Sequence, residues 1–301
     1  MSYLVLDIGG TAIKSAMSTP TGEIFDYRET PSDGRQGGAA LLNRVIKLID
    51  SYHGYDRIGV STAGQVDSAH GRIVFANDNI PGYTGTELGP LLARQFSVPV
   101  EVENDVNAAA LGETFLGSAQ GFPDFLCLTF GTGIGGAIMI NGSIYKGFSG
   151  LAGEFGHLVT HAAGRPCTCG QCGCYEQYAS TTALVRAATQ VNPNWTSGRR
   201  ITAARDAGEA GIGEVLAAWS EEAAFGLASL IHIFNPRLLV LGGGILADAD
   251  IFQRIKQQTL KKTMPESRNV EIRPAKLGNQ AGLLGMTYIC ANSIQTLYER
   301  Q

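Results

Sequence analysis

One histidine and several cysteines gather in a short, glycine-rich segment of the sequence. His157 is followed by Cys167, Cys169, Cys172 and Cys174. One imidazole and three thiolates suit a tetrahedral, structural Zn²⁺ site, which keeps no position open for catalysis. In a cytosolic chain, cysteines crowded in this way indicate a metal site before a disulfide. One cysteine is in surplus and His161 is a rival imidazole, so the spacing alone leaves the ligand set open.

A first glycine turn follows an apolar segment near the N-terminus. Asp7 stands at the end of that segment, before Gly9, Gly10 and Thr11, and Lys14 comes shortly afterwards. Glycines let backbone N–H groups converge on phosphate oxygens without obstruction by a Cβ atom. The Thr11 hydroxyl adds a donor, and Asp7 can hold a hydrated Mg²⁺ through water. The plain structural alternative is a hairpin turn capped by an acid.

A second turn, Gly131–Gly136, contains the pattern G-x-G-x-x-G, which suggests a dinucleotide-binding motif. That motif needs a helix directly after the glycines, whereas Ala137–Ile140 and the following Asn141-Gly142 predict a β-hairpin. We therefore predict a phosphate-binding hairpin with Thr132 and Gly133 in its turn, so that the two turns clamp a triphosphate. Gly243, in a glycine run after another apolar segment, is predicted to let a nucleoside lie close to the backbone.

An acid also follows the apolar segment at residues 98–103. Asn104 and Asp105 stand at its end, where ligand groups gather in α/β folds. Phosphoryl transfer to a sugar hydroxyl needs a carboxylate within hydrogen-bond reach of that hydroxyl. Asp105 fits that role, and the Asn104 amide can bind neighbouring hydroxyls. Asn-Asp pairs are also common helix N-caps, and both roles can hold, with one residue capping and the other reacting.

The elements that must position these residues alternate between strand and helix patterns, and the second half opens much as the first does. We predict strands at residues 3–7, 12–17, 22–29, 58–61, 98–103, 125–130, 137–140 and 238–241. Helices are predicted at residues 39–51, after Asp105, and at residues 213–234. Residues 189–200 are predicted to form an exposed loop, and a hinge between the halves is predicted near residues 113–122.

Bulk properties limit the function classes. The chain has 301 residues, enough for two domains, with 44% hydrophobic residues and a net charge of −4. The acidic balance argues against a nucleic-acid partner. We find no secretory signal and no apolar run long enough to span a membrane, so we expect a cytoplasmic protein without a membrane partner. Cys127 and Cys290 are predicted to be buried core thiols.

Taken together, these motifs resemble the ROK family (repressors, open reading frames and kinases), specifically its sugar kinases, over essentially the whole chain. The resemblance rests on Asp7–Thr11, Glu103–Ala108, Gly131–Gly136 and, above all, on Gly153–His157 combined with Cys167–Glu176. It implies an α/β, actin-like (ribonuclease H-like) two-lobed ATPase fold with ATP and sugar in an interlobe cleft. The lobes would be residues 1–115 and 116–286, and a C-terminal helix near residues 287–301 would pack back on the first lobe.

The same resemblance implies the site. Asp105 would be the catalytic base, and the sugar would contact Gly64, Asn104, Asp105, Glu154, His157 and Glu176. ATP and Mg²⁺ would be bound by Asp7, Gly9, Gly10, Thr11, Lys14, Thr132, Gly133 and Gly243. Zn²⁺ would be held by His157, Cys167, Cys169 and Cys174, because Cys172 falls at a variable position of the family motif. The metal would orient the side chains that bind the sugar.

The substrate is expected to be a hexose or hexose derivative phosphorylated at the 6-hydroxyl. Glu154, His157 and Glu176 resemble the branch that includes glucose, N-acetylmannosamine and β-glucoside kinases, and the cysteine pattern argues against the fructokinases of the family. One departure is Ala137, where many members extend the glycine run. A homodimer is expected. The alternative is a sugar-responsive regulator without kinase activity, but such proteins carry a winged helix-turn-helix domain before the strand that here begins at Tyr3. The presence of Asp105 argues against a non-catalytic actin-like assembly protein.

Overall fold

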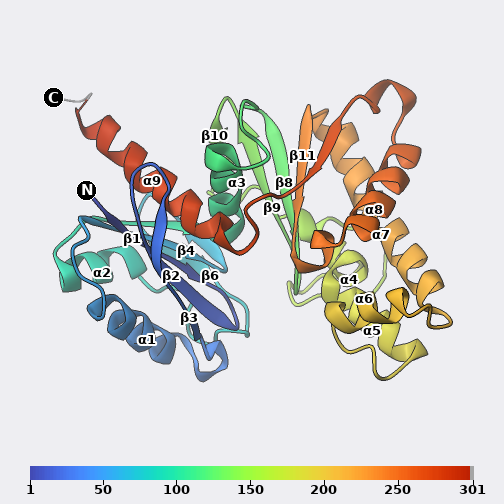
Figure 1. Cartoon of the computed structure of the whole chain (residues 1–301), viewed down its shortest axis with the longest axis horizontal. Coiled ribbons are helices and arrows are strands. Elements are labelled where there is room, and N and C mark those ends of the chain that lie inside the picture. Colours follow the sequence, from blue (N-terminus) through green and yellow to red (C-terminus); the bar gives the residue numbers. More distant parts are fainter. Residues whose placement is uncertain (299–301) are drawn as a thin grey trace. The chain divides into compact units, whose positions relative to one another are not determined.

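The structure is a computed structural model that describes residues 1–298, with side chains to residue 293 (Figure 1). Contacts divide the chain into two compact units. Unit 1 comprises residues 1–121, 146–152 and the chain from residue 279, and unit 2 comprises residues 122–145 and 153–278. The predicted lobes, residues 1–115 and 116–286, remain a prediction, and the contact-based units have different bounds. In particular, residues 146–152 belong to unit 1 although the chain on both sides of them belongs to unit 2.

Unit 1 is built on a five-stranded sheet. The strand order is β3 (Ile24–Pro31), β2 (Ala12–Ser18), β1 (Tyr3–Ile8), β4 (Arg57–Thr62) and β7 (Val100–Asn104). The first three strands form an antiparallel meander, and β4 and β7 continue in parallel with β1. A small hairpin of β5 (Gln65–Asp67) and β6 (Arg72–Phe75) accompanies the sheet.

Helices cover both faces of this sheet, which is why β1 is apolar on both sides. Leu4, Leu6 and Ile8 pack in one core cluster with residues of α1 (Gly38–Asp50) and α2 (Leu88–Phe96). The alternate residues Tyr3 and Val5 pack in another cluster with residues of α9 (Ala281–Tyr298). This alternation follows the two-residue period of a strand.

Helix α3 (Asp105–Leu116) lies against α9 at very short distance (Figure 1). Glycines permit this approach: a Cβ atom at Gly112 would lie 2.3 Å from the Ala281 carbonyl oxygen. A Cβ atom at Gly285 would lie even closer to the Ala108 carbonyl oxygen. The first residue of α3 is Asp105, so this tight backbone contact fixes the helix that carries the predicted base.

Unit 2 repeats the strand order of unit 1. Its sheet runs β10 (Ser143–Ile144), β9 (Ile134–Ile140), β8 (Phe125–Phe130), β11 (Leu238–Gly242) and β12 (Glu271–Pro274). Again three antiparallel strands are followed by two strands parallel to the central one. Asn141 and Gly142 both have positive φ, 53° and 74°, as a two-residue type I′ hairpin turn requires. The prediction of a hairpin, and the rejection of a dinucleotide-binding helix, are therefore confirmed.

The helices of unit 2 are α4 (Glu176–Ala179), α5 (Thr181–Val191), α6 (Gly198–Asp206), α7 (Ile212–Phe234) and α8 (Ala249–Lys262). Helices α7 and α8 lie side by side next to β11 (Figure 1). Short 3₁₀ turns complete the chain: η1 (Gly34–Gln36), η2 (Phe155–His157), η3 (Gly244–Ala247), η4 (Pro265–Ser267) and η5 (Gly278–Gln280).

The structure corrects the predicted bounds of one loop and of the C-terminal helix. The predicted exposed loop at residues 189–200 is wrong in extent, because α5 ends at Val191, α6 begins at Gly198, and Trp195 between them is only 3% exposed. The C-terminal helix belongs to unit 1 but begins at Ala281, earlier than predicted, and residues 299–301 of that prediction lie outside the described residues.

Cys127 and Cys290 are buried, as predicted. Among the described residues, no helix is long and apolar enough to cross a membrane.

Candidate active site and metal cluster

Asp7 lies near the end of β1, beside the first glycine turn. Sheet register places it opposite Lys14 on β2 and Ser61 on β4. The Ser61 hydroxyl donates a hydrogen bond of 2.9 Å to Oδ1, and the Lys14 ammonium lies 3.4 Å from Oδ2. A Cβ atom at Gly282 would come within 3.1 Å of the carboxyl carbon. The strand pairing thus brings Asp7 and Lys14 together beside Gly9. The absence of a side chain at Gly282 leaves space for the Asp7 carboxylate.

Asn104 is the N-cap of α3, so the capping interpretation is confirmed. Its Oδ1 accepts hydrogen bonds from the backbone N–H groups of Val106 and Asn107, at 2.9 and 3.1 Å. Its Nδ2 donates to the Gly64 carbonyl and to Asp105 Oδ1, both at 2.9 Å. Three residues predicted to bind sugar, Gly64, Asn104 and Asp105, therefore lie together at the ends of β4 and β7.

The Gly64 position has a structural reason of its own. Its φ is 102°, in the region that favours glycine. A Cβ atom there would lie 2.7 Å from the Phe75 carbonyl oxygen. Gly64 therefore keeps the end of β4 close to β6 and turns its own carbonyl toward Asn104.

The carboxyl of Asp105 is held in a state suited to proton transfer. Burial, and then the negative charge of Asp7, raise its pKa to about 7. Hydrogen bonds from the Val106 N–H at 3.0 Å and from Asn104 act in the opposite direction. A carboxyl with a pKa near neutrality is a good general base, because it is partly ionised and still basic enough to take a proton.

The glycines of the turns differ in whether backbone conformation or packing requires a residue without a side chain. Neither a left-handed φ nor a neighbour within 4 Å of an added Cβ atom explains Gly10, Gly131 or Gly244. Gly243, by contrast, has φ 115°, and its Cβ atom would lie 2.2 Å from the Phe130 carbonyl oxygen. The space beside the first three is open within the chain, as the approach of a ligand to the backbone would require. Gly243, which the sequence analysis assigned to nucleoside binding, therefore has a structural reason to be glycine, and that assignment stays a prediction.

In unit 2, glycines also bring the Gly153–His157 segment against β9. A Cβ atom at Gly136 would lie 2.4 Å from the Gly153 carbonyl oxygen, and one at Gly156 would lie 2.2 Å from the Ile134 carbonyl oxygen. The 3₁₀ turn η2 is thereby fixed on the sheet, with Glu154 as its N-cap residue. The Nε2 atom of His157 lies 3.9 Å from Glu154 Oε2.

Glu176 begins helix α4 and is positioned by its neighbour. The Tyr175 ring is fully buried against Gly226 of α7, and its hydroxyl donates a hydrogen bond of 2.5 Å to the Ala223 carbonyl. The Glu176 Oε1 atom lies 3.2 Å from Cys167 Sγ. A Cβ atom at Gly133 would lie 2.4 Å from Glu176 Oε2, so the second glycine turn and this carboxylate are immediate neighbours.

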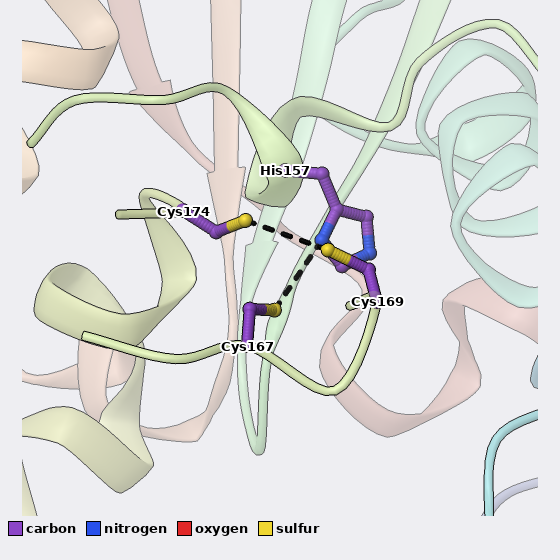
Figure 2. Close-up of side chains that lie close together, drawn as sticks. All are labelled: His157, Cys167, Cys169 and Cys174. Carbon is purple, nitrogen blue, oxygen red and sulfur yellow. Dashed lines mark hydrogen bonds between the residues drawn. The ribbon is translucent and has the colours of Figure 1, made fainter. Parts of the chain in front are cut away.

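The side chains of His157, Cys167, Cys169 and Cys174 form one cluster, in which all donor atoms lie within 4.8 Å of one another. Figure 2 shows them directed toward a common centre. The Cys169 and Cys174 sulfurs are 3.6 Å apart, and Cys167 Sγ is 3.7 Å from His157 Nδ1. Zn–S bonds of about 2.3 Å at tetrahedral angles separate two sulfurs by roughly 3.8 Å. The donor set and its spacing therefore fit Zn²⁺.

Two further observations bear on this fit. Burial, and hydrogen bonds with Cys169 and Cys167, raise the pKa of Cys174 to about 12, a protonated state that a bound dication would reverse. His157 directs Nδ1 to the cluster and Nε2 to Glu154, so one ring can serve both a metal and a second polar partner.

Cys172 and His161 lie outside this cluster. Cys172 is exposed, and its residue pairs with Pro166 in an antiparallel bridge. The His161 ring stacks on Tyr178 at 3.8 Å between centroids, and its Nε2 lies 3.6 Å from Glu222. The loop therefore brings together four donor residues, and neither Cys172 nor His161 is among them.

Comparison with known proteins supports the fold that the two sheets, with their common strand order, indicate. The chain has the actin-like, ribonuclease H-like fold of the kinases whose structures resemble it, among them a ROK glucokinase of Streptomyces griseus in complex with glucose and AMPPNP. That structure aligns with a TM-score of 0.86 and 29% identity, over 96% of this chain and 99% of that one. The sequence profile of the ROK family matches residues 3–293, and the chain belongs to this family.

Relatives of the chain include sugar kinases. It is 35% identical to a glucokinase of Halalkalibacterium halodurans, over 94% of this chain and 93% of that protein. It is 32% identical to a β-glucoside kinase of Listeria monocytogenes, over 96% of this chain and 97% of that protein. The resemblance stated from the motifs is thereby confirmed at the level of the family.

Proposed function

We propose that the protein transfers the γ-phosphoryl group of ATP to the 6-hydroxyl of a hexose or hexose derivative. The observation that carries this proposal is Asp105, a carboxylate with a pKa near 7 at the start of a capped helix. Its neighbours Gly64 and Asn104 can fix an acceptor hydroxyl beside it. Membership of the ROK family and the glucokinase relatives support the choice of a sugar as the acceptor.

In this reaction Asp105 accepts the proton of the acceptor hydroxyl as the oxygen attacks the γ-phosphorus. Glu154, His157 and Glu176 hold other hydroxyls of the sugar. The Asn104 donors already bind Gly64 and Asp105 in this structure, so a sugar contact by Asn104 requires that one of them be shared or replaced. The chain therefore contributes a base, orientation and charge stabilisation, as phosphoryl transfer requires.

Phosphate binding falls to the two glycine turns, with Thr11, Lys14 and Thr132 as additional donors. Asp7 would hold a hydrated Mg²⁺ bound to the nucleotide. Neutralisation of Asp7 by that ion would lower the pKa of Asp105, because Asp7 is the charge that raises it. Zn²⁺ would be held by His157, Cys167, Cys169 and Cys174 and would supply rigidity to the loop between His157 and Glu176. A homodimer remains a prediction.

The decisive experiment is a panel of sugars with ATP and Mg²⁺, monitored by ADP release. Glucose, N-acetylmannosamine and a β-glucoside represent the expected acceptors, and a 6-deoxy sugar is the matched control without the reacting hydroxyl. We expect ADP formation with at least one of the first three and none with the control. Sugar binding without ADP formation would favour the regulator over the kinase.

A further inference from the structure

Lys146 connects a crossing segment to the strand end that carries the proposed base. It is the first residue of the segment 146–152, which belongs to unit 1 although its flanking residues belong to unit 2. Its ammonium donates a hydrogen bond of 2.8 Å to Glu103 Oε2 and another to the Ser68 hydroxyl. All three residues lie in unit 1, so this contact fixes the segment where it enters that unit.

Glu103 links the Lys146 ammonium to the residues around Asp105 through hydrogen bonds. Its side chain is only 6% exposed. The Oε1 atom accepts hydrogen bonds from the Asn104 backbone N–H at 3.0 Å and from Asn107 Nδ2 at 3.1 Å. Both oxygens of a buried carboxylate are thus engaged, one by the cation and one by the first turn of α3. Asn104 in turn binds Asp105 through Nδ2.

Loss of the cation would disturb this arrangement at a specific place. A buried carboxylate that loses its cationic partner is strongly disfavoured, and Glu103 would move toward water or another donor. Such a movement would release the Asn104 N–H and Asn107 amide, which set the start of α3. A small displacement of a catalytic group lowers turnover markedly, since proton transfer requires close alignment.

We propose that Lys146 is a positioning residue for Asp105 and acts through Glu103 and Asn104. The proposal rests on the proposed function of Asp105 as the base. The same segment leads directly into Gly153–His157, which the chain needs for the sugar. Within unit 1, Lys146 therefore fixes the start of this segment to the strand end that precedes the base.

The test compares Lys146→Met with Lys47→Met, an exposed lysine on α1 of the same unit. In Lys146→Met we expect kcat to fall about 10- to 100-fold while the KM for ATP changes less than about twofold, as misalignment of a base predicts. Lys146→Arg should recover most of the loss, because the cation is retained. Lys47→Met should behave as wild type, and thermal unfolding of each variant shows whether the fold is retained.

A double-mutant cycle with Glu103→Gln separates positioning from general destabilisation. If Lys146 acts through Glu103, the double variant has about the kcat of Glu103→Gln alone. Multiplied losses in the double variant, or an unchanged kcat in Lys146→Met beside an active wild type, would overturn the inference. A wild-type protein that fails to turn over any sugar in the same assay would overturn the proposed function and this inference with it.

Discussion

Gly131 provides a sharp test of the proposed phosphate-binding turn, because no contact within the described structure requires glycine there. An added Cβ atom at Gly131 meets nothing within 4 Å, and the backbone is not left-handed. Gly131→Ala should therefore keep or raise the free energy of unfolding, by about 0.4–1 kcal/mol where the conformation suits alanine. If ATP phosphate approaches this backbone, the methyl group would displace it.

The expected change in ATP affinity follows from the loss of a hydrogen bond between the backbone and a phosphate oxygen. A hydrogen bond to a charged group contributes about 1.5–3 kcal/mol, and 1.4 kcal/mol corresponds to tenfold in affinity. We therefore expect the dissociation constant for ATP to rise roughly 10- to 150-fold in Gly131→Ala. Calorimetric titration with Mg²⁺-ATP measures this change, and urea unfolding measures stability in the same preparation.

Gly243→Ala is the matched control with the opposite expectation. Its φ of 115° and its 2.2 Å approach to the Phe130 carbonyl oxygen make any side chain strained. Backbone strain and overlap each cost about 1–3 kcal/mol, so stability should fall by about 2–6 kcal/mol in total. Gly133 is unsuitable for this purpose, since its Cβ atom would strike Glu176 Oε2 and disturb the sugar-binding set as well. If Gly131→Ala binds ATP as tightly as the wild type, the assignment of this turn to phosphate is refuted.

Three other predictions concern the base and the metal. Asp105→Asn should lower turnover roughly 10²- to 10⁴-fold with a much smaller change in sugar affinity, and near-normal turnover in a rapid-quench assay would remove Asp105 as the base. Because the pKa of Asp105 is raised to about 7 in the protein without Mg²⁺ and the base must be deprotonated, kcat/KM for Mg²⁺-ATP should fall about tenfold per unit below that pH; a level profile down to pH 5 would contradict this. Elemental analysis should find zinc in Cys172→Ser but not in Cys169→Ser, and the reverse pattern would overturn the ligand set.

Local signals predicted most strands of the two sheets and helix α7, but they missed α6 in unit 2. The Asn141-Gly142 turn and the apolar strand before it are strong local signals, and they correctly predicted the hairpin of β9 and β10. Helix α6 was missed because it is polar, with only Ile201 and Ala204 buried. Trp195 is buried by a tertiary contact, in which its Nε1 donates to Glu209 at 2.9 Å, and such a partner has no signature in the local sequence.

The candidate site likewise contains features that the sequence predicted and features that only the structure revealed. The strand-end position of Asn104 and Asp105 was visible in the sequence, because capping and ligand binding both use residues at that place. Spacing alone did not choose among the cysteines. The choice depends on how the loop closes: Gly173, with φ 82°, packs its backbone against His161. Cys174 is therefore buried while Cys172 faces solvent. The link from Lys146 to Glu103 joins residues far apart in sequence, and no local pattern could have predicted it.

The two sheets have one strand order, so the fold by itself gives each glycine turn the same place, between the first and second strands of its sheet. What differs is the chemistry beside each turn. Asp7 and Lys14 flank the first turn, which suits a phosphate with its cation. Glu176 lies against the second turn and also touches Cys167. The four donor residues are therefore one side chain away from the predicted phosphate turn. On the proposed roles of these residues, loss of a bound zinc should weaken sugar binding through His157 and Glu176 before it affects the turn at Asp7.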